Sequence, residues 1–146
     1  MRIRRYHLAV AMLVAALGLV ATVVYAQGQE TKVLDQWKTT VQHSKFSQNY
    51  ANTKEITSHL QHVVNCIEGQ RGPLYDGGVG NPCQGQGSGL ITDSKAAGGK
   101  YTQAVPLFEV ADEIAATGLK TKSVEKAKTA GWATQMVLER AGEILK

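Results

Sequence analysis

The segment of residues 69–99 restricts the fold of this chain more than any other feature, because its sequence supports neither a helix nor a strand throughout its length. It holds ten of the chain's 15 glycines and two of its three prolines, and no hydrophobic period persists along it. A loop this long in a compact domain is usually functional or held down by a cross-link. We therefore predict a long glycine-rich loop over residues 69–99.

Helical patterns flank the loop on both sides. The clearest covers residues 52–69, in which Asn52 and Glu55 form a capping-box pattern and Gly69 provides a C-cap. The apolar residues of this segment recur at helical spacing and mark one face: Ile56, Leu60, Val63, Val64 and Ile67. The pattern predicts an amphipathic helix with one buried face.

Three further helices are predicted from the same period. The first begins near Gln29, and the last runs from Ser123 to about residue 145. The third helix of the chain either begins near Val105 or is kinked at Pro106. Because short connections favour antiparallel neighbours, we predict an all-α fold, namely an antiparallel up-down four-helix bundle with the glycine-rich loop between helices 2 and 3.

The first 26 residues have the pattern of a secretory signal peptide. A basic start is followed by residues 8–24, which carry no charge, and the small residues Val24 and Ala26 precede the expected cleavage point. We predict removal of residues 1–26 and a single domain over residues 27–146, which is periplasmic or secreted. The alternative is an uncleaved segment that anchors the protein N-terminally in the membrane.

The charge of the predicted domain argues against a polyanionic partner. The whole chain has 16 lysines and arginines against 12 acidic residues, but three of the arginines and none of the acids precede residue 27. The remaining balance of 13 to 12 leaves a net charge of +1. Because no basic patch remains, we expect no nucleic-acid partner, and a membrane contact only if the N-terminal segment stays uncleaved.

The chain has two cysteines, Cys66 and Cys83. An even number of cysteines in an exported protein favours a disulfide, because the compartment is oxidising. The bond would connect the end of the 52–69 helix to the middle of the loop and remove about 3 kcal/mol of entropy from the unfolded chain. A paired Cys66 has no thiolate and is then not a metal ligand.

His59, His62 and Cys66 share one stripe of a single predicted helix, beside its apolar face. If the first two helices form a hairpin that turns near residue 51, His43 stands at the same height as His59. Three imidazoles in one place suit zinc or copper, and a facing pair suits haem iron. His43, His59 and His62 are therefore candidate metal or haem ligands, with Cys66 excluded by the disulfide.

No combination of residues in the sequence indicates catalysis. The H-E-x-x-H, C-x-x-C-H and phosphate-loop patterns are absent, and no acid–base partner can be placed for Ser88 or Ser94. We therefore predict no catalytic residues and no enzyme. The loop also has too few acidic side chains for a calcium site, which needs several oxygen ligands at regular spacing.

Residues 59–89 contain the pattern H-x-x-H-x-x-N-C-I-x-G, followed by Y-D-G and then N-P-C-x-G-x-G. This arrangement resembles a helix-and-glycine-loop pattern of uncharacterised exported bacterial helical proteins, whose loops are often richer in aspartate. The resemblance implies that the following residues act as one unit: His59, His62, Asn65, Gly69, Asp76, Asn81 and Pro82. Asn65 points away from the apolar face on a helical wheel, where its amide can bond back to the loop.

The favoured interpretation is a small exported helical bundle that acts as a non-catalytic binding or interaction module. It needs no cofactor, and its glycine-rich loop contacts an envelope protein or small ligand whose identity the sequence does not indicate. The alternative is a periplasmic metal-binding or haem-binding protein. It would hold zinc, copper or haem through His59 and His62, with His43 as the third candidate ligand.

Overall fold

The computed structural model describes residues 27–146, and this part of the chain is all-α, with five helices and no strand. The all-α prediction is therefore confirmed. Residues 27–46 form a helix that we call the N-terminal helix. It is followed by α2 (Thr53–Glu68), α3 (Leu90–Ala97), α4 (Gly99–Leu119) and α5 (Val124–Leu145).

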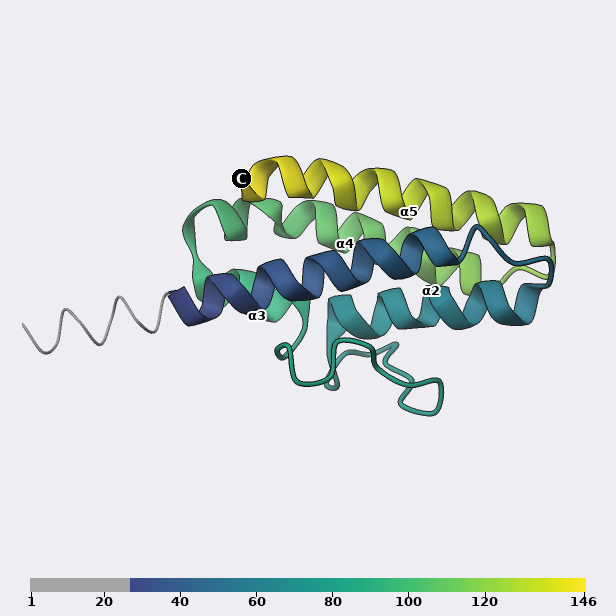
Figure 1. Cartoon of the computed structure of the whole chain (residues 1–146), viewed down its shortest axis with the longest axis horizontal. Coiled ribbons are helices and arrows are strands. Elements are labelled where there is room, and N and C mark those ends of the chain that lie inside the picture. Colours follow the sequence, from purple (N-terminus) through teal and green to yellow (C-terminus); the bar gives the residue numbers. More distant parts are fainter. Residues whose placement is uncertain (1–26) are drawn as a thin grey trace, which may run out of the picture.

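The four long helices lie side by side, as Figure 1 shows. The N-terminal helix and α4 run in one direction, and α2 and α5 run back in the other. Their inner faces enclose one hydrophobic core, in which Ile56 and Leu60 of α2 and Phe108 of α4 are completely buried. The short α3 lies at the end of the molecule where α4 begins and α5 ends. Helices α2 and the N-terminal helix thus form a hairpin on one side of the core.

The ends of α2 and α5 follow the capping residues of the sequence. The Asn52 side chain accepts a hydrogen bond from the Glu55 N–H at the start of α2, and Gly69 follows its last residue. The Ser123 side chain caps α5 by accepting from the Lys126 N–H. These caps satisfy backbone groups that a helix leaves unpaired at its ends. They explain why the bounds of both helices were readable from local sequence.

Two glycines of α5 allow the N-terminal helix and Ser47, the residue that follows it, to approach closely. A β-carbon at Gly142 would overlap the Trp37 ring, and one at Gly131 would overlap the Ser47 side chain. The indole N–H of Trp37 donates to the Leu138 carbonyl oxygen at 2.8 Å. The missing side chains on α5 therefore set the spacing of the two helices.

The loop prediction for residues 69–99 is wrong over its last part, because α3 forms within it. Leu90, the first residue of α3, is completely buried in the core. The Asp93 carboxylate accepts hydrogen bonds from the Ser88 N–H and from the side-chain amide of Gln36, both at 2.7 Å. Gln36 lies on the N-terminal helix, so α3 depends on a tertiary contact that no local hydrophobic pattern displays.

Of the two alternatives for the third long helix, a start near Val105 is wrong. The helix α4 begins at Gly99, upstream of Val105, and it contains Pro106. Gly98 and Gly99 have φ angles of 75° and 52° and form the turn between α3 and α4. Pro106 is exposed and so is Thr102, whose carbonyl group loses its helical N–H partner to the proline and can be hydrated instead.

The predicted signal peptide of residues 1–26 lies outside the described residues. Among the helices of residues 27–146, none is both long enough and hydrophobic enough to cross a membrane. The predicted disulfide between Cys66 and Cys83 is present, with the two Cα atoms 5.3 Å apart. A disulfide in the folded chain indicates an oxidising, extracytoplasmic compartment.

Candidate metal centre

Three histidines converge between the N-terminal helix and α2. The Nδ1 atom of His43 lies 3.0 Å from Nδ1 of His59 and 3.1 Å from Nδ1 of His62. One ligand atom from each ring lies within 4.8 Å of those of the other two. The three imidazoles therefore present nitrogen atoms to a common point.

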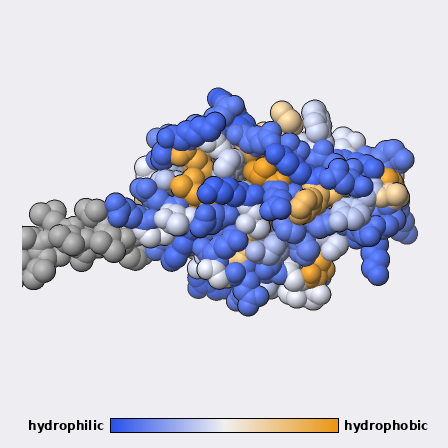
Figure 2. Space-filling view, viewed as in Figure 1, coloured by the Kyte–Doolittle hydropathy of each residue, from blue (hydrophilic) through white to orange (hydrophobic). Residues whose placement is uncertain are grey.

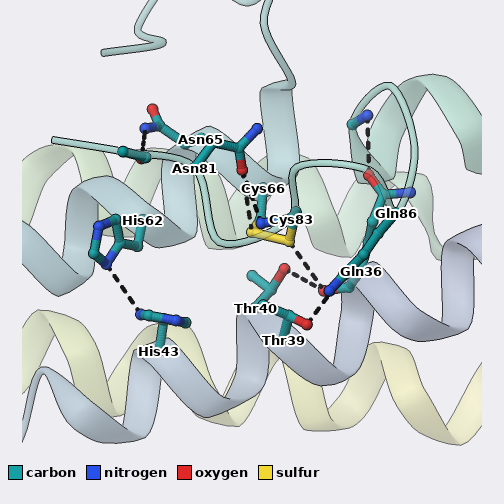
Figure 3. The surroundings of a disulfide bond; sticks show 12 residues. Gln36, Thr39, Thr40, His43, His62, Asn65, Cys66, Asn81, Cys83 and Gln86 are labelled. Atoms are coloured by element: carbon teal, nitrogen blue, oxygen red, sulfur yellow. Dashed lines mark hydrogen bonds between the residues drawn. A yellow bond between two sulfur atoms is a disulfide. The ribbon is translucent and has the colours of Figure 1, made fainter. Parts of the chain in front are cut away.

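The helical hairpin explains this convergence. His59 and His62 are three residues apart on α2, and consecutive turns of a helix place such side chains on one face. The connection after residue 46 reverses the chain, so His43 of the N-terminal helix comes to the same height. Figure 3 shows His43 and His62 pointing toward one another across the two helices. Sequence reasoning brought these three residues together, and the structure places them in one cluster.

Two aromatic residues flank the cluster, and sequence reasoning missed both. The ring of Tyr50 stacks on that of His59, with centroids 5.0 Å apart and an angle of 21° between the planes. The ring of Phe46 meets that of His43 edge-on at 5.5 Å. Phe46 follows His43 by three residues on the N-terminal helix, a spacing that could have marked it, whereas Tyr50 lies beyond the end of that helix and had no such signal. Their rings restrict the orientation of the imidazoles.

Burial and neighbouring imidazoles keep two of the three rings, His43 and His59, uncharged. Burial lowers the pKa of His43 to about 4, and the neighbouring imidazoles of His62 and His59 act in the same direction. Burial, followed by His62, also lowers the pKa of His59, although the Glu55 carboxylate opposes this shift. Both rings are therefore neutral at neutral pH, which is the form of imidazole that binds metals.

A backbone carbonyl from the loop determines the tautomer of His62. Its Nε2 atom lies 3.0 Å from the carbonyl oxygen of Val79. A carbonyl oxygen only accepts, so the single proton of neutral His62 sits on Nε2 and the lone pair is on Nδ1. Metal-binding histidines are commonly oriented in this way through their second ring nitrogen. Val79 carried no signal in the sequence, because its contribution comes from the backbone.

Asn65 ties the same part of the loop to α2. Its amide donates to the carbonyl oxygens of Asp76 at 2.8 Å and Gly80 at 2.6 Å, and its oxygen accepts from the Asp76 N–H at 2.9 Å. Gln61 donates to that same oxygen at 3.0 Å. Asn65 is completely buried, although it lies opposite the core face, because the loop covers it.

The other residues of the proposed loop unit have separate places. Asn81 accepts from the Cys83 N–H at 2.9 Å and shapes the chain at the disulfide, as Figure 3 shows. Gly69 ends α2 and contacts the backbone of Ser88. Asp76 joins Asn65 through its backbone, whereas its carboxylate accepts from the Gly78 N–H and is not among the three clustered ligands. Pro82 is partly buried between Asn81 and Cys83.

Three further contacts fix the start and end of the loop, and the sequence did not indicate them. Glu68 accepts a hydrogen bond from the Leu74 N–H at 2.7 Å, and Gln61 donates to the Leu74 carbonyl oxygen at 2.8 Å. At the other end, the Gln36 side-chain oxygen accepts from the Gly89 N–H at 3.0 Å. The loop is therefore bonded to the second half of α2, from Gln61 to Glu68, and to the N-terminal helix.

Asp112 of α4 lies beside Glu68 and provides a pH-dependent prediction. Burial, then the charge and hydrogen bond of Glu68, then Glu113, raise the pKa of the Asp112 carboxyl to about 7. A raised carboxyl pKa means that the folded state holds the proton more tightly than the unfolded state. Stability is therefore unaffected below about pH 4 and falls as the pH rises toward 7.

We expect Asp112→Asn to remove this loss and to stabilise the protein by roughly 1–2 kcal/mol at pH 8, after allowance for solvent screening, with little effect at pH 4. Thermal unfolding at pH 4, 6 and 8 measures the difference. Glu109→Gln, an exposed carboxyl on the same helix, is the control. A stabilisation by Asp112→Asn that does not grow with pH would contradict the assignment.

No protein-family model, curated protein or solved structure matches this chain. The resemblance of residues 59–89 to exported helical proteins thus stays a prediction.

Proposed function

We propose that this protein is an exported helical bundle of up-down topology that binds one zinc or copper ion through His43, His59 and His62. The observation that supports the proposal most directly is the convergence of the three Nδ1 atoms. Imidazole nitrogen is a good ligand for both ions. The disulfide agrees with an extracytoplasmic location for such a protein.

The spacing of the nitrogen atoms suits a single ion. Bonds of 2.0–2.1 Å in a tetrahedral arrangement place ligand nitrogens about 3.3–3.4 Å apart. The separations from His43 are 3.0 Å to His59 and 3.1 Å to His62. The two separations from His43 therefore need to lengthen by a few tenths of an ångström to match this geometry, and the ligand atoms of all three rings already lie within 4.8 Å of one another.

The positions of the protons on the imidazole rings also suit a bound metal ion. With the Nε2 proton of His62 held by the Val79 carbonyl, Nδ1 of His62 is an acceptor. The Nδ1 atom of His43 is the one that contacts both others, so a single proton on it satisfies both short distances. An ion would take the place of this proton, which would move to Nε2 of His43. Three neutral imidazoles then supply three ligands and leave a fourth position for water or another small ligand.

The same geometry favours an ion over haem, the other cofactor considered from the sequence. Two axial histidines of a haem lie on opposite sides of the macrocycle, bonded to one iron. Nitrogen atoms 3.0–3.1 Å apart, drawn together at one point by three rings, leave no gap for a planar macrocycle between them. We therefore restrict the proposal to a single metal ion.

The interaction-module prediction has weaker support from the contacts. The loop directs side-chain and backbone hydrogen bonds inward to α2, at Gln61, His62 and Asn65. The face of the molecule in Figure 2 is mainly hydrophilic, and its hydrophobic residues form small separate patches. We therefore assign the loop to the support of the metal centre rather than to a docking surface.

The test is metal binding by the untagged protein produced from the full chain. We expect calorimetric titration to give one zinc or copper(II) ion per chain, with copper(II) the tighter, as the usual order of divalent-metal affinities requires. His43→Ala removes the ring that contacts both others. Loss of an outer-shell partner weakens metal binding by about 10–100-fold. Because His43→Ala removes a ligand itself, we expect it to weaken binding by more than that.

Ser58→Ala is the matched control, because Ser58 adjoins His59 on α2 and is not one of the clustered ligands. It should bind as the wild-type protein does. Absence of one-to-one binding in the wild-type protein, or equal affinity in His43→Ala and wild type, would refute the proposal.

A further inference from the structure

We propose that Asn65 is a positioning residue of the metal centre: it holds the loop so that the Val79 carbonyl keeps Nδ1 of His62 free for the ion. This inference rests on the proposed function and adds the part of the chain that orients one of its ligands. Asn65 itself is not a ligand, since all of its effect passes through the loop.

The side-chain amide of Asn65 holds the loop at two points. One amide group bonds to both the N–H and the carbonyl oxygen of Asp76, and also to the carbonyl oxygen of Gly80. The residues between these two anchor points, including Val79, are therefore fixed at both ends. Gly80 has a φ angle of 99°, which favours glycine and gives the chain the bend it needs there.

The anchored segment, residues 76–80, lies over His62. Val79 immediately precedes Gly80, and its carbonyl oxygen lies 3.0 Å from Nε2 of His62. His62 and Asn65 are three residues apart on α2, so both contact the same stretch of loop from neighbouring turns. The anchor and the ligand are thus parts of one rigid arrangement.

The position of the proton on the His62 imidazole decides which of its nitrogen atoms can bind an ion. A neutral imidazole has one proton, and an acceptor at Nε2 holds it there. Without the Val79 carbonyl, the ring of His62 would lose the acceptor that holds its proton on Nε2, so the share of its Nδ1–H tautomer would rise and the ring could turn about its side-chain bonds. Only the tautomer with the proton on Nε2 has the lone pair on Nδ1, the atom that faces His43. Metal binding would then include the cost of selecting tautomer and orientation.

The burial of Asn65 argues that its polar groups have a purpose. A buried amide is destabilising unless it is hydrogen-bonded, and a hydrophobic residue is the usual occupant of such a position. Asn65 is completely buried and takes part in four hydrogen bonds, three of them to the loop backbone. A hydrophobic side chain could fill the space but could not set the path of residues 76–80.

The experiment compares Asn65→Ala with wild type and with Thr39→Val. The control removes a hydrogen bond between the N-terminal helix and Gln86 of the loop, away from residues 76–80. In metal-free protein at pH 8, the ¹⁵N shifts of the His62 ring report its tautomer. We expect the Nε2–H tautomer in wild type and Thr39→Val, and a mixture of both tautomers in Asn65→Ala.

Zinc titration of the same three proteins is the second measurement. We expect Asn65→Ala to weaken zinc binding by about 10–100-fold, the usual effect of losing an outer-shell partner, and Thr39→Val to leave it within about twofold. Asn65→Leu fills a similar volume but offers neither the donors nor the acceptor that hold residues 76–80, so it should weaken zinc binding as Asn65→Ala does. This variant is the substitute if Asn65→Ala does not fold.

The two proposals fail in different measurements. If wild type binds no metal, the proposed function is refuted. If the His62 tautomer is Nδ1–H in wild type, or if neither tautomer nor zinc affinity depends on Asn65, the positioning role is refuted. A loss of thermal stability in Asn65→Ala without a change in the His62 ring shifts would also refute it, because a purely structural role predicts that result.

Discussion

Replacing Gly69 by alanine is expected to destabilise the folded protein by about 3–5 kcal/mol, because two separate penalties combine at this position. Gly69 has φ 72° and ψ 179°, a conformation that is essentially restricted to glycine. A β-carbon there would also overlap the carbonyl group of Ser88, which is backbone and cannot rotate away. The two ends of the loop cross at this point, with Gly69 against Ser88 and Gly89.

Urea unfolding measures this effect, and Gly85→Ala separates the two penalties. Gly85 has a φ angle of 82°, but a β-carbon added there would meet no heavy atom within 4 Å, so its substitution adds strain without a collision. We expect Gly85→Ala to cost only about 1–2 kcal/mol. Equal losses at the two positions would mean that the loop ends are not in contact.

Removing the disulfide is expected to lower the free energy of unfolding by about 3 kcal/mol. The bond joins residues 17 apart in sequence, and its loss enlarges the conformational freedom of the unfolded chain. Cys66 is completely buried and Cys83 is 2% exposed, so replacement of both by alanine also leaves the interior less well filled. The segment that the bond holds continues into Asn81 and Gly80, beside the metal centre. We therefore expect weaker zinc binding as well.

Chemical unfolding of Cys66→Ala/Cys83→Ala, with and without dithiothreitol, measures this prediction. Dithiothreitol should lower the stability of the wild-type protein toward that of the double variant and should not affect the variant. Thiol titration of the denatured wild-type protein should detect no free thiol. Two free thiols, or a wild-type stability that reductant leaves unchanged, would contradict the role assigned to the bond.

The helices of this protein were largely predictable because their signals are local. The period of Ile56, Leu60 and Val63 identifies the buried face of α2, and all three are completely buried. Asn52 and Gly69 mark its two ends, where a helix requires partners from outside its own hydrogen-bond pattern. Such signals involve residues within one or two turns of one another, so they are present in the sequence itself.

The short helix α3 was not predictable in this way. Its eight residues contain too few hydrophobic positions to display a period, and its stability comes from burial of Leu90 and from the Gln36–Asp93 hydrogen bond. That bond joins residues 57 apart in sequence. Glycines surround the segment, as they do in loops, so the local signals indicated a loop and not a helix.

The metal centre likewise has some features that the local sequence predicts and others that it does not. The spacing of His59 and His62 and the assumed hairpin to His43 were enough to predict that the three residues meet. The choice of Nδ1 over Nε2 was not predictable, because it depends on the Val79 carbonyl oxygen. A backbone carbonyl is common to every residue and leaves no mark in the sequence.

The amino-acid sequence by itself determined the helical class, the caps of α2 and α5, the disulfide and the proximity of three histidines. Each of these depends on side-chain identity at short spacing or on a single cysteine pair. Only the tertiary structure decided the path of the loop over α2, the burial of Asn65 and the orientation of His62. These features depend on hydrogen bonds to backbone atoms whose positions are set by the rest of the fold, and side-chain order alone does not specify them.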